Sequence, residues 1–226
     1  MTVEAGEFHC WYSADIAEAR KKGQYLLTKF GRYLKGRIVD LGCGEGALLL
    51  ALRESGKSDL LGVESNKELA DLAESWGVPI VRKDLLEYLR QGGLETGTYV
   101  YIDVLEHVPF EMNLEVMERI PRGSRLILQT PHTETLLGHK YYFNVPSHLA
   151  AYSPFVLRKM LARNDHKVIT EGSIDEKHAP GWKRRVRGIL ARKLFDLPEE
   201  LFLGGGNYFV VADRERMVPA AGKPAG

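Results

Sequence analysis

Short apolar runs alternate with amphipathic segments from residue 38 onward. Runs such as Leu-Leu-Gly-Val at 60–63 are apolar throughout, which is typical of strands buried on both faces of a parallel sheet. The segments between such runs repeat apolar residues at the spacing of an α-helix. This alternation predicts an α/β fold with a doubly wound parallel sheet. The predicted strands are 38–41, 60–64, 80–82, 99–102, 125–129, 167–170 and 208–212.

Helix boundaries are marked by glycine and by capping residues. Gly56 and Gly77 close two of the predicted helices, and Ser153 followed by Pro154 marks the start of another. The segment 132–152 is rich in aromatic and polar residues and is expected to be a loop; loops of that length are more often functional than structural. The predicted helices are 15–34, 47–55, 67–76, 86–90, 110–119 and 154–163.

The length of 226 residues is enough for one well-buried domain. We expect this domain to span 1–213, with an N-terminal helical arm at 1–35 and a helical insertion at 173–206. Residues 214–226 are rich in Ala, Gly and Pro and are expected to form a flexible tail.

The segment 182–195 in this insertion combines an apolar stripe with a basic surround. It is expected to be a solvated helix docked on the domain. The alternatives are contact with an anionic substrate, peripheral contact with a membrane, or contact with a partner subunit in a homodimer. The stripe residues are Trp182, Val186, Ile189, Leu190 and Leu194.

The balance of charge limits the possible partners. The 31 basic and 30 acidic side chains nearly cancel, so no global field attracts DNA, and RNA binding is not favoured. The two cysteines are too few for a disulfide framework and fit a reducing compartment. No apolar run approaches the roughly 20 residues that span a bilayer, so a cytoplasmic protein is expected.

A glycine-rich turn follows the first predicted strand. Gly42, Gly44 and Gly46 are spaced GxGxG and lead directly into a helix, an arrangement that brings backbone N–H groups to a polar cofactor. Glu64 ends the second strand, where an acid can bind both ribose hydroxyls of an adenosine, and Asp84 ends the third, within reach of an adenine amino group. No Lys-Ser/Thr pair of a P-loop is present, so phosphate is not the expected anchor.

These motifs resemble those of the class I S-adenosylmethionine-dependent methyltransferases. The matching stretches are VDLGCGEGALL at 39–49, GVE at 62–64, Asp84, and DVLEHVP at 103–109. The resemblance implies a Rossmann-like, mostly parallel sheet of seven strands with the last antiparallel, and S-adenosylmethionine as cofactor. The residues it assigns to the cofactor are Asp40, Gly42, Cys43, Gly44, Gly46, Glu64, Ser65, Asp84, Leu85 and Asp103.

The LEHV segment is similar to that of ubiquinone-pathway O-methyltransferases and of bacterial methyltransferases acting on glycan or lipid-linked acceptors. The stretch YYFNVPSHLAAYSPFVLRKML at 141–161 resembles their acceptor-side loop and following helix, although Val145 stands where an acid often precedes the proline. The resemblance implies O-methylation of a small-molecule, glycan or lipid-linked acceptor.

Catalytic candidates follow the fourth and fifth predicted strands. Asp103, Glu106 and His107 are spaced i, i+3, i+4 and would share one face if that turn were helical. Three roles stay open: the Glu-His pair fixes the loop, His107 is a general base, or the two acids and histidines bind Mg²⁺ or Zn²⁺. His132 and His148 are further catalytic candidates because they belong to the 132–152 loop, whereas His166 is expected at the surface.

Two other functions are compatible with the sequence. The basic cluster at 183–193 is compatible with an RNA-modifying methyltransferase, although the near-zero net charge argues against it. A catalytically silent module that binds S-adenosylmethionine and a partner is the second alternative, but such a module would not require the intact glycine turn and acids.

Overall fold

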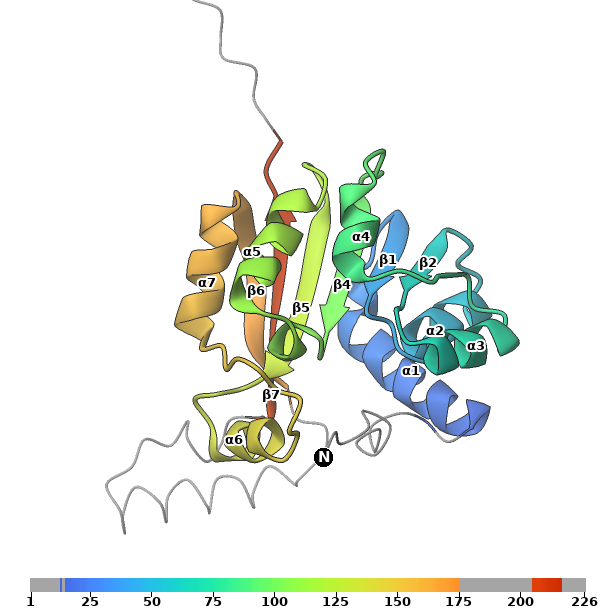
Figure 1. Cartoon of the computed structure of the whole chain (residues 1–226), viewed down its shortest axis with the longest axis horizontal. Coiled ribbons are helices and arrows are strands. Elements are labelled where there is room, and N and C mark those ends of the chain that lie inside the picture. Colours follow the sequence, from blue (N-terminus) through green and yellow to red (C-terminus); the bar gives the residue numbers. More distant parts are fainter. Residues whose placement is uncertain (1–12, 14, 175–204, 217–226) are drawn as a thin grey trace, which may run out of the picture.

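A seven-stranded sheet organises the part of the chain that the computed structural model describes, namely residues 13, 15–174 and 205–216 (Figure 1). The strands are β1 (Arg37–Leu41), β2 (Leu60–Val63), β3 (Ile80–Val81), β4 (Gly97–Ile102), β5 (Arg125–Pro131), β6 (His166–Ile174) and β7 (Asn207–Arg214). Their order across the sheet is β3-β2-β1-β4-β5-β7-β6. Strands β1 to β5 run parallel to one another, and β7 runs antiparallel to its two neighbours, β5 and β6. The predicted sheet, including its antiparallel last strand, is confirmed.

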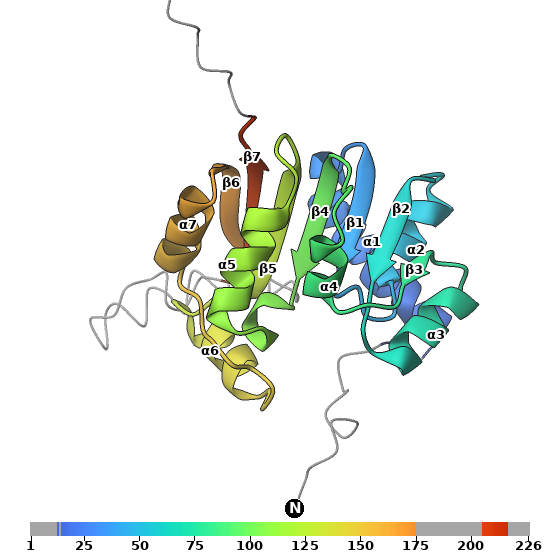
Figure 2. The ribbon, with the colours of Figure 1, turned by 45° about the horizontal axis from the view of Figure 1, so that its top comes forward.

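Helices cover both faces of this sheet (Figure 2). They are α1 (Ile16–Phe30), α2 (Ala47–Glu54), α3 (Lys67–Ser75), α4 (Leu85–Arg90), α5 (Phe110–Arg119), α6 (Leu136–Phe143) and α7 (Pro154–Arg163). Side chains of α1, α2 and α3 pack into one buried cluster, and those of α4, α5 and α7 pack into the other. The sheet is therefore doubly wound.

Successive residues of the central strands face opposite helix layers. In β4, Tyr99 and Tyr101 pack in the cluster of α4, α5 and α7, whereas Val100 packs in the cluster of α1, α2 and α3. In β1, Val39 packs in the cluster of α4, α5 and α7, and Ile38 packs in the cluster of α1, α2 and α3. Each of these five side chains of β1 and β4 is at most 1% exposed. Because neither face meets water at these positions, consecutive residues of both strands are apolar or aromatic.

The prediction of a loop over 132–152 is wrong in its middle, where α6 forms. Thr135 caps this helix, because its side chain accepts the N–H of Gly138 at 3.0 Å. Leu136 and Phe143 of α6 are exposed. The apolar and aromatic residues of its sequence, LLGHKYYF, do not recur with helical periodicity, so the pattern that reveals an amphipathic helix is missing.

Two other boundaries differ from the prediction. The first helix ends at Phe30 and continues as a 3₁₀ turn over Gly31–Tyr33. The predicted start of the insertion at residue 173 is too early, because Ser173 and Ile174 form the end of β6 and pair with β7. Most of that insertion, including 182–195, and the tail from 217 lie outside the described residues. Within the described ranges, no helix is both long and apolar enough to cross a membrane.

The winding of the sheet reverses at β1, which pairs in parallel with both β2 and β4. In open α/β sheets, ligands bind at the carboxyl ends of the strands at such a reversal. The glycine turn follows β1, and Asp103 follows β4. The predicted cofactor residues therefore lie at the point where this fold places a ligand.

Candidate active site

The turn between β1 and α2 holds three glycines in the left-handed region. The φ angles of Gly42, Gly44 and Gly46 are +71°, +56° and +75°, values that other residues rarely adopt. A Cβ atom on Gly42 would lie 2.8 Å from a methyl carbon of Val104, which follows β4. Gly46 is the N-cap of α2 and provides no side-chain acceptor for the first-turn N–H groups. The turn thus brings backbone donors to the sheet edge.

Glu64 lies directly beside this turn. One of its carboxylate oxygens accepts the N–H of Gly44 at 2.8 Å, and the other accepts the N–H of Asn66 at 2.7 Å. The side chain is buried, whereas the adjacent Ser65 is exposed. Since each carboxylate oxygen has two acceptor sites, Glu64 can still receive hydroxyl groups of a ligand.

Asp84 begins α4 as its N-cap. Its Oδ1 atom accepts the N–H of Leu86 at 2.8 Å and that of Glu87 at 3.4 Å, so these bonds do not use Oδ2. Leu85, the first residue of the helix, is buried. The local sequence therefore fixes the acid next to the end of β3, the position predicted for adenine recognition.

Two further predicted cofactor residues lie at the turn, Asp40 buried and Cys43 half-buried. Burial raises the pKa of Asp40 to about 7, an effect that the charge of Lys22 partly offsets. Burial also raises the pKa of the Cys43 thiol well above its ordinary value. The Cys43 side chain is therefore a neutral thiol that packs near Gly62 rather than a nucleophile.

Sequence reasoning missed a polar group that joins α1 to the turn. Lys22 Nζ and Ser13 Oγ each donate to Oε1 of Glu45 at 3.0 Å, and Glu45 is only 1% exposed. The charge of Lys22 also opposes the rise in the pKa of Asp40 and of Asp103. In the sequence Lys22 is one of several basic residues on the polar face of α1, which gave no signal that it reaches the site.

Asp103 has an unusual backbone conformation, with φ of +53° at the end of β4. Gln129 Nε2 lies 3.0 and 2.9 Å from its two carboxylate oxygens and donates to them. The turn after β4 is a 3₁₀ helix that begins only at Leu105. The predicted common helical face of Asp103, Glu106 and His107 is therefore wrong, because Asp103 lies outside the helix.

Glu106 is a buried carboxyl group between β5 and the segment after α6. Its Oε2 atom accepts the hydroxyl of Thr130 at 3.0 Å, and its Oε1 atom lies 3.9 Å from Nε2 of His148. Its backbone carbonyl accepts the N–H of Leu149 at 2.7 Å. Burial, followed by the charge of Asp103, raises the pKa of Glu106 well above its ordinary value. Glu106 thus both fastens the loop and presents one oxygen to a histidine.

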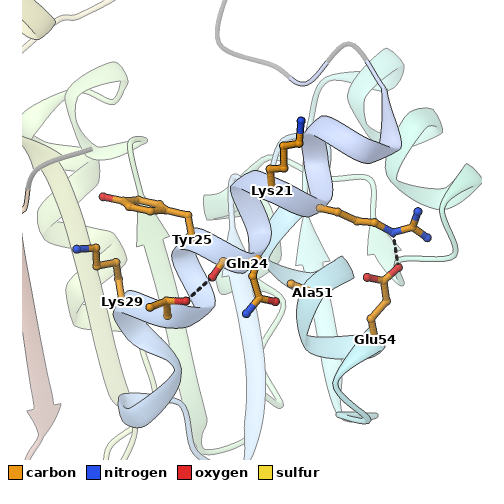
Figure 3. A pocket seen from close by; sticks show the side chains of 8 residues that line it. Lys21, Gln24, Tyr25, Lys29, Ala51 and Glu54 are labelled. Atoms are coloured by element: carbon orange, nitrogen blue, oxygen red, sulfur yellow. Dashed lines mark hydrogen bonds and ion pairs between the residues drawn. The ribbon is translucent and has the colours of Figure 1, made fainter. Parts of the chain in front are cut away.

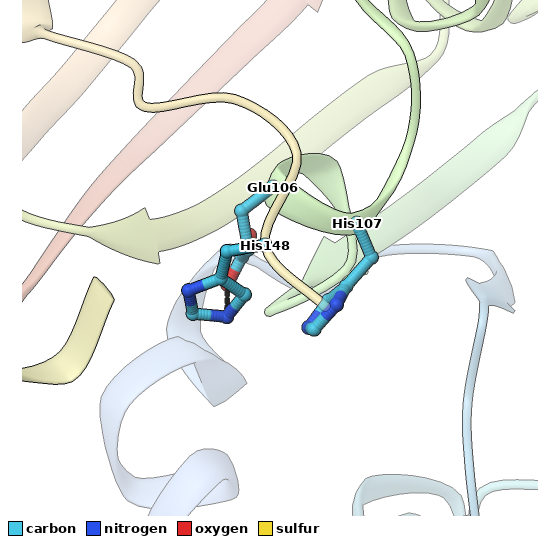
Figure 4. Close-up of side chains that lie close together, drawn as sticks. All are labelled: Glu106, His107 and His148. Carbon is cyan, nitrogen blue, oxygen red and sulfur yellow. Dashed lines mark ion pairs between the residues drawn. The ribbon is translucent and has the colours of Figure 1, made fainter. Parts of the chain in front are cut away.

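His107 and His148 form a pair of imidazoles beside Glu106 (Figure 4). Their ring centroids are 4.6 Å apart, and burial lowers the pKa of both rings. Nδ1 of His107 lies 3.3 Å from the Ser147 carbonyl, and Nδ1 of His148 lies 2.7 Å from the Tyr142 carbonyl. A carbonyl only accepts, so each Nδ1 carries the proton and each Nε2 keeps a lone pair.

The predicted metal set of Asp103, Glu106 and His107 is not brought together. Within the described part of the chain, the ligand atoms that lie within 4.8 Å of one another belong instead to Glu106, His107 and His148. The carboxylate of Asp103 accepts hydrogen bonds from Gln129 instead. Sequence spacing suggested the set with Asp103, but the left-handed conformation of Asp103 directs it away from Glu106 and His107.

His132 and His166 both differ from what their positions suggested. His132 contacts β6 and β7, with Nδ1 3.0 Å from Ser173 Oγ and its ring against Tyr208, and none of these contacts joins it to the imidazole pair. His166 is only 4% exposed, and its Nε2 donates to the Met117 carbonyl at 2.9 Å. The expectation of a surface position for His166 is wrong, because β6 turns this side chain into the core.

Asn113 holds the 3₁₀ turn in place. It is fully buried, and its amide nitrogen bonds to the carbonyls of Leu105 and Val108 at 2.9 and 3.0 Å and to the hydroxyl of Tyr152 at 2.9 Å. Tyr101 donates its hydroxyl to the amide oxygen at 2.8 Å. The segment that carries Glu106 and His107 is thus tied to β4 and α5, a role with no recognisable sequence signal.

A surface groove of about 640 Å³ lies between α1 and α2 (Figure 3). An ion pair between Arg20 and Glu54, 2.8 Å long, borders it, and Lys21 and Lys29 contribute further positive charge. None of its lining residues is a predicted cofactor or acceptor residue. The groove is therefore a feature of the outer face of α1, separate from the candidate site.

Methyltransferases are among the solved structures that share this fold. A methyltransferase from Archaeoglobus fulgidus described as dependent on S-adenosylmethionine is 21% identical, with a TM-score of 0.69 over 85% of this chain and 93% of its own. Magnesium protoporphyrin IX methyltransferase from Synechocystis, with bound S-adenosylmethionine, is 15% identical, with a TM-score of 0.55 over 90% and 86%. Geranyl diphosphate C-methyltransferase from Streptomyces coelicolor, in complex with Mg²⁺, geranyl diphosphate and S-adenosylhomocysteine, is 16% identical, with a TM-score of 0.56 over 91% and 85%.

A family model described as a methyltransferase domain matches residues 12–171. This range contains the glycine turn, Glu64, Asp84 and the imidazole pair. The chain therefore belongs to this methyltransferase family, and the resemblance to class I S-adenosylmethionine-dependent methyltransferases is confirmed. No curated protein matches the sequence.

Proposed function

We propose that this methyltransferase transfers a methyl group from S-adenosylmethionine to an oxygen atom of a small-molecule, glycan or lipid-linked acceptor. When bound, S-adenosylmethionine supplies a methyl group on a positively charged sulfur, which is already electrophilic. The protein then has to hold the cofactor, align the acceptor and assist loss of one proton.

The residues around the glycine turn fit this cofactor. The left-handed glycines form the tight turn that leads into α2, and Glu64 retains acceptor sites for two ribose hydroxyls. We assign the adenine to Asp84 and Leu85, and the methionine part to the turn and to Asp40. The full proposed set is Asp40, Gly42, Cys43, Gly44, Gly46, Glu64, Ser65, Asp84, Leu85 and Asp103.

The imidazole pair is the observation that supports an oxygen acceptor. Transfer to a hydroxyl requires a proton acceptor, and Nε2 of His148 has a lone pair because its Nδ1 faces a carbonyl. Glu106, 3.9 Å away, would stabilise the imidazolium that forms. Val104 lies close enough to Gly42 that a Cβ atom there would meet it, so the acceptor and the cofactor would meet at the same sheet edge.

The test is to incubate the protein with S-adenosylmethionine and a panel of phenols, sugars and prenylated alcohols. S-adenosylhomocysteine release should accompany an O-methylated product, and His148→Asn should lower kcat at least about 100-fold. His139→Asn is the matched control, because His139 is exposed on α6. A product methylated only at nitrogen or carbon would refute the oxygen acceptor, and full activity in His148→Asn would refute His148 as the proton acceptor. In a parallel incubation with RNA, methylation of the RNA alone would favour the RNA-modifying alternative.

The roles proposed for 182–195 at a membrane or in a homodimer concern residues outside the described ranges. The cytoplasmic location also stays a prediction.

A further inference from the structure

We propose that Glu106, His107 and His148 bind a divalent ion of the zinc type. One ligand atom from each residue lies within 4.8 Å of the others, around a common point beyond the carboxyl ends of β4 and β5 (Figure 4). In a tetrahedral zinc site neighbouring ligand atoms are roughly 3.4 Å apart, as follows from bond lengths of about 2.1 Å. The three side chains would therefore need to move inward by about 1 Å to hold an ion.

The hydrogen bonds around the three residues already orient them as ligands. Metal-binding histidines commonly donate their second N–H to a backbone carbonyl, and both imidazoles do so here, to Ser147 and Tyr142. Thr130 holds Oε2 of Glu106 and leaves Oε1 toward His148. The distance of 3.9 Å between Oε1 and His148 Nε2 is too long for a hydrogen bond, so these two atoms face each other without bonding.

The donor set selects the class of ion. Two imidazole nitrogens and one carboxylate oxygen suit Zn²⁺, Co²⁺ or Fe²⁺, whereas Mg²⁺ and Ca²⁺ prefer oxygen ligands alone. Three protein ligands leave a fourth position open, as in catalytic zinc sites. The site thus replaces Asp103 of the predicted set by His148, and this exchange favours Zn²⁺ over Mg²⁺, the two ions that the sequence left open.

An ion at this position would change how the acceptor is activated, a consequence that rests on the proposed function. The ion would lower the pKa of a hydroxyl placed at the open position. The O–H bond would then break with its electron pair left on oxygen, and the proton would leave to water. With the ion bound, His148 would serve as a ligand and would no longer accept the proton itself.

The test uses Co²⁺ as a spectroscopic probe on protein freed of metal with a chelator. Tetrahedral Co²⁺ absorbs strongly in the visible range, so titration should give one saturable site whose bands Zn²⁺ removes and Mg²⁺ does not. His107→Ala and His148→Ala should each weaken Co²⁺ binding at least about tenfold. His139→Ala should bind Co²⁺ like the wild type. Glu106→Gln tests the carboxylate as a ligand in the same titration, with thermal unfolding as the check that this variant is folded.

Equal Co²⁺ affinity in the wild type, His107→Ala and His148→Ala would overturn the site, as would displacement by Mg²⁺. The readout does not need turnover, so it separates the two proposals. Loss of S-adenosylhomocysteine binding or of methyl transfer with Co²⁺ binding intact would reject the proposed function alone. If titration shows no Co²⁺ site and methyl transfer to oxygen is equally fast with and without chelator, the proposed ion alone is rejected.

Discussion

The backbone N–H of Gly44 donates to the carboxylate of Glu64 across 2.8 Å, so the acid that follows β2 is bonded to the turn that follows β1. The second oxygen of Glu64 accepts the N–H of Asn66, the N-cap of α3. Two loops that end neighbouring parallel strands are thus joined through one side chain. This bond fixes the distance between the part of the site proposed for methionine and the part proposed for ribose.

Replacing Gly42 by Ala should destabilise the protein and weaken cofactor binding together. The positive φ angle alone costs roughly 1–2 kcal/mol for a residue with a Cβ atom. The new methyl group would also lie 2.8 Å from Val104, so we expect a loss of unfolding free energy larger than the backbone strain alone. Urea denaturation and calorimetric titration with S-adenosylhomocysteine measure the two effects.

Gly56→Ala is the matched control for this substitution. Gly56 has a φ angle of +88°, but a Cβ atom there would meet nothing within 4 Å. It should lose only the backbone strain and keep its affinity for S-adenosylhomocysteine. If both variants lose the same stability, the contact with Val104 does not constrain the turn.

The buried Asp40 should make the stability of the cofactor-free protein fall as the pH rises from about 4 to about 7. Its pKa is raised from 3.8 to about 7 by burial, so in this interval the folded state binds more protons than the unfolded state. The contribution is complete below pH 3.8 and is lost as the pH passes through 7, with a slope on the order of 1 kcal/mol per pH unit.

Asp40→Asn should remove this dependence, because the amide resembles the protonated carboxyl group. The difference in unfolding free energy between variant and wild type should be small near pH 4 and should favour the variant at pH 8. Asp59→Asn, at an exposed ion pair with Arg37, should change little across the same range. A constant difference between Asp40→Asn and the wild type at all pH values would contradict the raised pKa.

Asn113→Asp should lower turnover more than cofactor affinity. The substitution places a carboxylate against the carbonyls of Leu105 and Val108, which now receive hydrogen bonds, and should cost about 2–4 kcal/mol of stability. The displaced turn carries Glu106 and His107, whereas the glycine turn proposed for the cofactor lies between β1 and α2. Measuring kcat and the dissociation constant of S-adenosylhomocysteine for the same variant separates the loss of turnover from the loss of cofactor affinity. Asn164→Asp, which loses one bond at the end of α7, is the control, and a parallel loss of both quantities in Asn113→Asp would contradict the expected split.

The sheet and the cofactor side of the site follow from local sequence patterns. Apolar strands, the glycine turn, Glu64 and Asp84 are each fixed by residues that are neighbours in the chain, and the structure brings them to one sheet edge. Even the cap of α7 was readable, since Ser153 accepts the N–H of Val156.

The acceptor side depends on contacts between distant segments. His148 reaches Glu106 only because the loop after α6 is bonded to the Glu106 carbonyl, and Lys22 reaches Glu45 only because α1 packs on α2. The spacing of Asp103, Glu106 and His107 was misleading because one left-handed residue interrupts the helix that it suggested. The prediction of a surface position for His166 was wrong for a similar reason, because its burial depends on how β6 packs in the sheet.

Calorimetric titration of S-adenosylhomocysteine into the wild type and Glu64→Gln is the most direct test of the account. Gln keeps the size of Glu64 but replaces an acceptor by a donor beside the Gly44 N–H. Glu54→Gln, at the exposed pair with Arg20, is the control. We predict saturable binding to the wild type and to Glu54→Gln, and binding at least about tenfold weaker to Glu64→Gln. No binding to the wild type, or equal binding to all three proteins, would contradict the proposed cofactor site.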